Sequence, residues 1–282
     1  MQAAQIDTND LATALREEII AGHVRLPTLP DVAVRVKAAA EGGSSAGEIA
    51  ALVAQDIALS GRLVQVANSP LYRGRAEIDS IQVAVTRLGT RLVRAFVIGM
   101  AFRQMFDASS AVLTKLFRDI CQDAVEIAAI CRVLAETSPD TDPEEAMLGG
   151  LLHNIGALPI LARLDEAYGD DIDSHVVHEL VDELAPEIGT RILKSWGLSE
   201  ALVAVPEGCH ALERDSGPRI DYVDIVFAAR LQYLFSEGLI NVTPEMSNLP
   251  ALKKLGIQFE TVVLEQVSTA VWAKQIHNTL DF

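Results

Sequence analysis

Apolar residues recur with helical spacing along most of the chain. Leu11, Leu15 and Ile19 stand four residues apart, which places them on one face of a helix. Ile81 and Val85 repeat the same spacing further along. No stretch shows sustained alternation of apolar and polar residues bounded by hairpin turns, as half-buried strands would. The pattern therefore predicts an all-α protein.

Capping residues and helix breakers indicate where the helices begin and end. Ser45 precedes Glu48 by three residues, the spacing of a capping box. Asp142 followed by Pro143 is typical of a helix start, because proline is tolerated at the first helical position. Helices are predicted over about residues 10–21, 31–41, 45–54, 56–66, 80–88, 90–106, 109–136, 142–162, 218–238, 244–250 and 260–279.

Composition narrows the class of protein. Half of the 282 residues are hydrophobic and 22% are charged, so the chain can bury a sizeable core. The formal net charge of −16 repels phosphate backbones and anionic lipids, so we expect no nucleic acid and no membrane as partners. The N-terminus lacks the basic start and apolar run of a signal peptide, and three cysteines make no disulfide framework. A cytoplasmic protein is expected.

Charge is distributed unevenly. Residues 60–105 hold seven arginines and two acidic residues, whereas residues 140–215 hold 17 acidic and four basic residues. Solvated helix faces explain such an asymmetry. Alternatively, the two regions serve docking to a partner or self-association.

The segment with most chemical content is EEAMLGGLLHNIGALPIL, residues 144–161. It places the polar pair His153–Asn154 inside an otherwise apolar stretch, which is expected to be a buried core helix over residues 148–162. Burying polar side chains without partners is costly, so hydrogen bonds or a ligand must satisfy the pair.

GLLHNIG within this segment resembles the GLLHDIG helix of the HD superfamily of metal-dependent phosphohydrolases, in which the adjacent His and Asp ligate a divalent metal. Upstream and downstream segments select one branch of that superfamily. LPTLP (26–30), Ala-Asn-Ser (67–69), Leu-Gly (88–89) and Trp-Gly (196–197) resemble motifs of the HDOD domain, the HD-related output domain of bacterial signalling proteins.

The resemblance covers about residues 20–235 and implies a multi-helical bundle in two subdomains, expected over residues 1–107 and 108–282. It also implies where metal ligands belong. The first position falls near Asp123, the HD pair on His153–Asn154 and a later pair on Cys209–His210. Two further ligand positions fall on Ala185 and Ala229, which offer no donor.

The resemblance therefore implies a vestigial pocket. Asn154 is neutral where the family has a carboxylate, and a catalytic metal needs at least three firm ligands and an open position. No cofactor and no catalytic residue are expected, although adventitious zinc is compatible with such mixed donors. The residues assigned to the vestigial pocket are Asp123, His153, Asn154, Cys209 and His210.

A second group of residues is a candidate ligand or partner site. Asn68 and Ser69 follow a helix directly, where Asn often caps the terminal carbonyls, so a structural helix stop is the simpler interpretation. The alternative is a site for a small ligand or partner formed by Asn68, Ser69, Tyr72, Arg91 and Arg94.

The function implied by the resemblance is a non-catalytic regulatory or scaffolding module in bacterial signal transduction. Its expected partners are signalling proteins, and self-association stays open. One alternative is a metal-dependent phosphohydrolase or phosphodiesterase of the HD superfamily. A second alternative is a sensor that binds a small ligand in the vestigial pocket.

Overall fold

Helices make up all the regular structure of the described residues, and no strand occurs among them, which confirms the all-α prediction. The computed structural model describes residues 8–21, 26–69, 72, 76–106, 108–241 and 243–257. The helix predicted over residues 260–279 lies outside these ranges.

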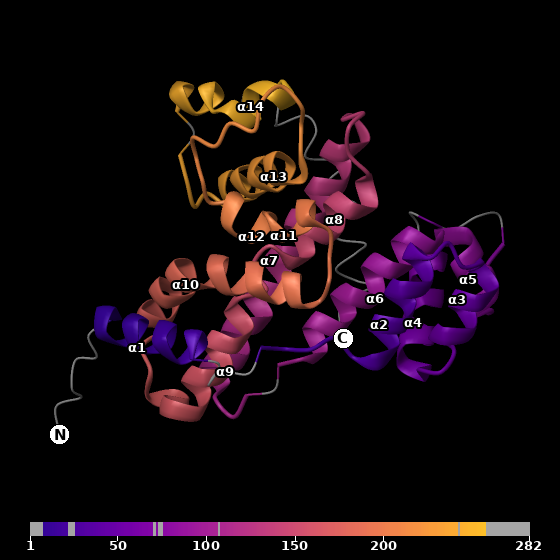
Figure 1. Cartoon of the computed structure of the whole chain (residues 1–282), viewed down its shortest axis with the longest axis horizontal. Helices are drawn as coiled ribbons and strands as arrows, with labels where there is room; N and C mark the ends of the chain where they lie inside the picture. The colour runs from indigo at the N-terminus through magenta and orange to yellow at the C-terminus, as the bar shows by residue number, and fades with distance from the viewer. Residues whose placement is uncertain are drawn as a thin grey trace.

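The described part of the chain forms fourteen α-helices and two 3-10 helices (Figure 1). They are α1 (Thr8–Ile20), α2 (Asp31–Glu41), α3 (Ala46–Val53), α4 (Ile57–Asn68), α5 (Ile81–Leu88), α6 (Thr90–Gln104), α7 (Ala111–Glu136), α8 (Pro143–Leu152), α9 (Ala157–Tyr168), η1 (Gly169–Asp171), α10 (Ser174–Ser195), α11 (Glu200–Val203), α12 (Val205–Gly208), α13 (Tyr222–Ser236), η2 (Pro244–Asn248) and α14 (Pro250–Leu255).

Side-chain caps fix several helix starts as the sequence indicates. Ser45 and Glu48 form the predicted capping box at the start of α3. The Asp56 carboxylate accepts from the backbone N–H of Leu59, and the Asp142 carboxylate caps α8 ahead of its proline. Each bond satisfies an N–H that has no partner inside its own helix.

Two predicted helices are wrong in their boundaries. The expected continuous helix over 148–162 breaks after Leu152, and α9 begins only at Ala157. Pro159 explains the break, because it has no N–H to donate to Ile155 and suits only the first turn of a new helix. The helix predicted to start at residue 218 starts at Tyr222, where Asp221 forms a capping box.

Two groups of helices share one core. Helices α2 to α6 pack against one another at one end of the molecule, at the right of Figure 1. Helices α7 to α13 pack at the other end, and the contact of α6 with α8 joins the groups. Helix α1 packs on α10, within the predicted second subdomain, and the boundary at residue 107 stays a prediction.

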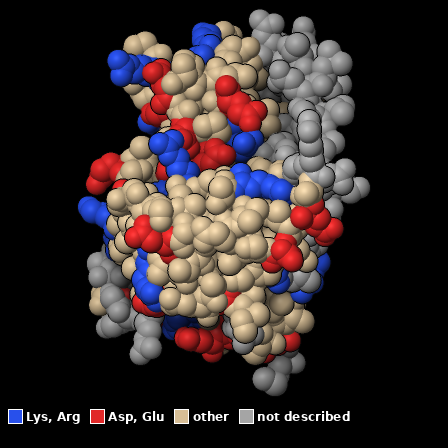
Figure 2. All heavy atoms as spheres, turned by 90° about the vertical axis from the view of Figure 1, so that its right-hand side faces the viewer, with Lys and Arg blue, Asp and Glu red and all other residues tan. Residues whose placement is uncertain are grey.

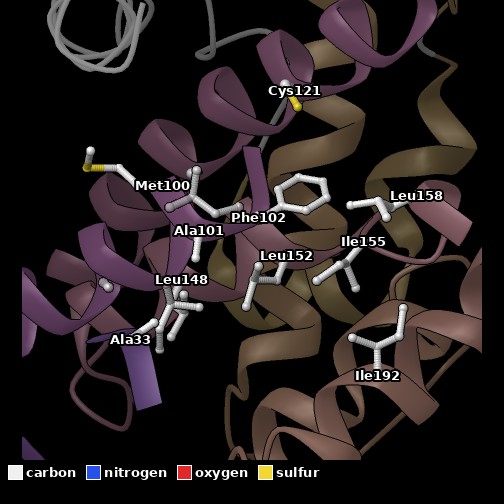
Figure 3. Packing of buried hydrophobic residues seen from close by; sticks show 14 of the residues in the cluster. Ala33, Met100, Ala101, Phe102, Cys121, Leu148, Leu152, Ile155, Leu158 and Ile192 are labelled. Carbon is white, nitrogen blue, oxygen red and sulfur yellow. The ribbon is translucent and has the colours of Figure 1, made fainter. Parts of the chain in front are cut away.

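Buried side chains from both groups interdigitate in the shared core. Figure 3 shows Ala33 of α2, Phe102 of α6, Leu148 of α8, Leu158 of α9 and Ile192 of α10 in one cluster. A smaller cluster joins α7, α12, α13 and α14. The continuity of the core holds α8 at the centre of the protein, and the His-Asn pair follows α8 directly.

Two of the segments that resemble HDOD motifs, LPTLP and Trp-Gly, are in contact in the folded chain. The Trp196 indole N–H donates to the Pro27 carbonyl at 2.8 Å, so the turn after α10 is tied to the segment before α2. The side chain of Trp196 is buried while its polar tip keeps a partner, as buried indoles require.

The stretch Pro143–Asp171 is long and apolar enough to cross a membrane by length and composition. In the structure it is α8, a turn, α9 and η1 rather than one helix, and 83% of its most apolar window is buried against other helices. That burial is the pattern of a core segment in a soluble protein.

Candidate functional site

The turn between α8 and α9 positions the His-Asn pair, and two glycines allow it to lie deep in the bundle. A Cβ atom on Gly150 would lie 2.6 Å from Cα of Ala128 in α7, and one on Gly156 would lie 2.0 Å from the carbonyl oxygen of Ala185 in α10. Only glycine permits these backbone approaches. The two glycines of GLLHNIG therefore allow the turn to pack closely between α7 and α10.

A cavity of about 810 Å³ opens beside this turn. Apolar side chains from α7, α10 and α13 form much of its wall, and exposed Lys115, Asp182 and Leu239 lie at its outer end. The structure brings three of the five predicted pocket residues into this lining. The polar residues of the inner wall are Asp123, His153, Asn154, Arg230 and Tyr233.

His153 presents a lone pair to the cavity. Its side chain is 5% exposed, and its Nδ1 lies 2.8 Å from the Gly150 carbonyl oxygen. A carbonyl can only accept, so Nδ1 carries the proton and Nε2 is an unprotonated acceptor. Burial lowers the pKa of His153 to about 3, and the positive charge of Arg230 contributes to the shift. His153 is therefore neutral at physiological pH.

Asp123 faces the same cavity from α7. The hydroxyl group of Tyr233 on α13 donates a hydrogen bond to its carboxylate. Burial raises the pKa of Asp123, and the Tyr233 hydrogen bond opposes this shift. The phenol thus stabilises the charged form of a partly buried acid.

Cys209 and His210 lie next to Arg230 but are not part of the cavity lining. The Arg230 guanidinium donates to the Cys209 carbonyl oxygen at 2.6 Å. Burial raises the pKa of the Cys209 thiol, so it stays protonated. Burial and then the Arg230 charge lower the pKa of His210 to about 4.

Arg230 is the central residue of the site that the sequence did not reveal. It stands on α13 directly after Ala229, the position where the family resemblance places a closing carboxylate. One indication of its role was present in the sequence, a single arginine in the apolar run IVFAARLQYLF. A charged side chain in such a run is rarely buried unless it is paired.

The donor set does not fit a catalytic metal. Ala185 and Ala229 are buried and offer no ligand atom, and Asn154 offers an amide in place of a carboxylate. No group of three His, Cys, Asp or Glu residues that could hold a metal ion occurs in the described part of the chain. The Arg230 charge beside both histidines repels a divalent cation.

Residues of the second predicted site mainly make contacts that hold a loop and a helix end in place. The Asn68 side chain donates to the carbonyl oxygen of Ile78 at 2.6 Å and accepts from the N–H of Ile78 at 2.9 Å. Ser69 caps the end of α4, and Tyr72 lies close to Arg132 of α7, half-buried. The Asn68 amide is thus occupied in closing the loop that follows α4.

Arg91 and Arg94 have different surroundings. The exposed Arg91 side chain pairs with Asp142. Arg94 is 7% exposed and pairs with Glu145 of α8 and, at 3.1 Å, with Glu41 of α2. The charge of Arg94 is buried and joins three helices, which favours a structural role, and its place in a ligand or partner site stays a prediction. At the α2–α6 end, Figure 2 shows blue and red side chains interspersed around a broad uncharged area.

The comparisons agree with this architecture. The HDOD domain family matches residues 26–211, so the chain belongs to the HDOD domain family.

Solved structures and a curated relative extend the likeness. A candidate metal-dependent phosphohydrolase from Shewanella amazonensis SB2B is 25% identical with a TM-score of 0.81, covering 97% of this chain and 99% of that one. A candidate signal transduction protein from Marinobacter aquaeolei VT8 is 21% identical with a TM-score of 0.67, covering 98% and 68%. An uncharacterized protein from Treponema pallidum is 22% identical over 83% of this chain, and the match spans 46% of that protein's length.

Proposed function

We propose that this HDOD protein is a non-catalytic regulatory module of bacterial signal transduction, located in the cytoplasm, with other signalling proteins as its partners. The observation that carries the non-catalytic part is Arg230, a fixed cation next to both histidines of the degenerate ligand set. The likeness in fold to a signal-transduction candidate from Marinobacter supports the setting.

The chemistry of phosphoester cleavage supports the same conclusion. A metal ion in this reaction neutralises phosphoryl oxygens and generates hydroxide near neutral pH. A cation in an apolar helical interior requires anionic ligands to offset its desolvation. Among the residues that the structure describes, Asp123 is the sole carboxylate on the inner wall of the cavity. One carboxylate, one neutral imidazole and one arginine do not make such a site.

Turnover assays test this proposal. The wild-type protein is incubated with manganese, iron(II), nickel or zinc and assayed on bis-p-nitrophenyl phosphate and p-nitrophenyl phosphate. No turnover above the metal-only control is expected. Turnover that chelation abolishes, and that is lost in His153→Ala but kept in His175→Ala on the exposed part of α10, contradicts the proposal.

A metal-dependent phosphohydrolase is the second candidate function. The Shewanella protein of the same fold carries this description, and His153 offers its Nε2 to the cavity in the tautomer that metal-binding histidines use. The missing ligands at positions 154, 185 and 229 weigh against it.

A further inference from the structure

Arg230 is partly buried and has no carboxylate partner among the described residues. Arg87 also lacks one, but both of its guanidinium Nη atoms donate to backbone carbonyls, of Ala67 and Ala76. Arg94, Arg163 and Arg214 each pair with one or more carboxylates. In the described part of the chain, the hydrogen bonds of Arg230 all run from Nη1 to Cys209, at 2.6 Å to its carbonyl oxygen and at 4.0 Å to its Sγ. The Nε and Nη2 donors of Arg230 therefore have no acceptor among the described residues, and Arg230 lines the cavity.

Other polar side chains near Arg230 also have hydrogen-bonding atoms without a partner. The Nε2 atom of His210 is buried and has no hydrogen-bond partner among the described residues. Asn154 lines the cavity with an amide that can donate as well as accept. Buried polar groups without partners are rare, and a ligand or ordered water usually satisfies them. At the inner end of the cavity, Arg230 and the Asn154 amide thus supply hydrogen-bond donors, and His210 lies beside Arg230 outside the lining.

The carboxylates that line the cavity either accept a hydrogen bond from a neighbouring side chain or lie at the mouth of the cavity. Asp123 accepts from Tyr233, and Asp119 accepts from Lys115 at 3.2 Å. The side chain of Asp182 is exposed to solvent. None of the three lies within ion-pair distance of Arg230 in the described structure. The guanidinium is therefore available to an anion that enters from outside.

Most of the remaining wall of the cavity is apolar, and its further polar residues, Ser174 and His178, are exposed. Ile120, Ile127, Val181 and Leu234 belong to this apolar part of the wall. A volume of about 810 Å³ exceeds what inorganic phosphate fills and lies within the ~300–1,000 Å³ range of pockets for small organic molecules. The lining matches a ligand with one charged group and an apolar body.

We propose that this cavity binds a small organic anion, whose phosphate or carboxylate group is held by the Nε and Nη2 donors of Arg230. The planar guanidinium fork suits the paired oxygens of both groups. The ligand body contacts the aliphatic side chains of α7, α10 and α13. This inference rests on the proposal that the cavity is not a metal centre, and it gives the regulatory module an input of defined chemistry.

Calorimetric titration with three probes tests the inference. Phenyl phosphate and benzoate supply the two oxyanions on an aromatic body, and benzyl alcohol supplies the body without the charge. We expect at least one of the two anions to bind one site per chain, and benzyl alcohol to bind at least tenfold more weakly. No saturable binding of either anion, or equal binding of benzyl alcohol, overturns the inference.

Variants locate the site. Arg230→Gln removes the charge, and Asn154→Asp adds a carboxylate that repels an anion while preserving the shape of the side chain. Each is expected to weaken binding at least tenfold. Arg118→Gln removes an exposed charge of α7 outside the cavity and is expected to leave affinity unchanged. Binding that survives both cavity variants overturns the inference.

Two further readouts keep the outcomes separate. Circular dichroism melting establishes that each variant is folded, and Asn154→Asp carries the test if Arg230→Gln is not. Phenol release from phenyl phosphate, followed in the presence of manganese, reports hydrolysis. Metal-dependent hydrolysis contradicts the proposed function and, with it, this inference, whereas absent binding without hydrolysis overturns this inference alone.

Discussion

Replacing His153 with Asn should reduce the loss in the free energy of unfolding that occurs as the pH falls. The buried imidazole has a pKa of about 3 in the folded state, well below the ordinary value of 6.5. Because the folded-state pKa is depressed, its contribution to stability is fully present above pH 6.5. That contribution is lost as the pH falls, since the unfolded chain then binds a proton that the folded chain does not.

The size of the effect follows from the two pKa values. Each unit of pH between them shifts the free energy of unfolding by about 1.4 kcal/mol. Between pH 7 and pH 5, His153 alone therefore removes about 2 kcal/mol of stability. Arg230 contributes positive potential at the ring, but burial is the larger cause, so neutralising Arg230 alone should recover only part of this loss.

Urea unfolding of the wild type and His153→Asn at pH 7 and pH 5 measures the difference. Asn keeps an N–H near the position of Nδ1 for the Gly150 carbonyl and does not titrate. The wild type is expected to lose about 2 kcal/mol more than His153→Asn over this interval. His175→Asn, which changes an exposed histidine, should behave as the wild type. Equal losses in the wild type and His153→Asn would refute the reasoning.

Other substitutions test the packing and the loop contacts. Gly156→Ala should lower the free energy of unfolding by roughly 3 kcal/mol or more, because its Cβ would lie 2.0 Å from a backbone oxygen of α10. Gly61→Ala, on the exposed face of α4 with nothing within 4 Å, should raise it by about 0.5–1 kcal/mol, and a change of the opposite sign in urea unfolding would contradict the prediction for that variant. Trp196→Phe should cost about 1–2 kcal/mol through the lost bond to Pro27, seen as a lower melting temperature, and an unchanged melting temperature would show that the bond adds nothing. Asn68→Ala should cost about 1–3 kcal/mol through two lost bonds to the following loop, and an unchanged urea midpoint would reopen a ligand role for Asn68.

Local chemistry explains what could be predicted from the sequence. The capping box at Ser45 and the Asp142–Pro143 start depend on residues close in sequence, so both could be recognised without the fold. The family motifs indicated an all-α HDOD scaffold because their order along the chain is specific. The HD-like turn could be found for the same reason, since GLLHNIG is one short segment.

Contacts between distant segments explain what could not be predicted. The place of Arg230 beside His153 and His210 depends on how α13 packs against the rest of the bundle, which no local pattern encodes. Arg94 looked like a surface charge because its partners Glu41 and Glu145 are 53 and 51 residues away. Helical periodicity also did not show the break before Ala157, because the residues on both sides are equally apolar.

Metal binding by the purified protein tests most directly the claim that Arg230 and the missing ligands exclude a metal centre. The measurement is equilibrium dialysis against micromolar zinc or manganese, followed by elemental analysis of the wild type and His153→Ala. The account predicts substoichiometric metal that does not differ between the two proteins. One equivalent of metal in the wild type, lost in His153→Ala, would contradict it.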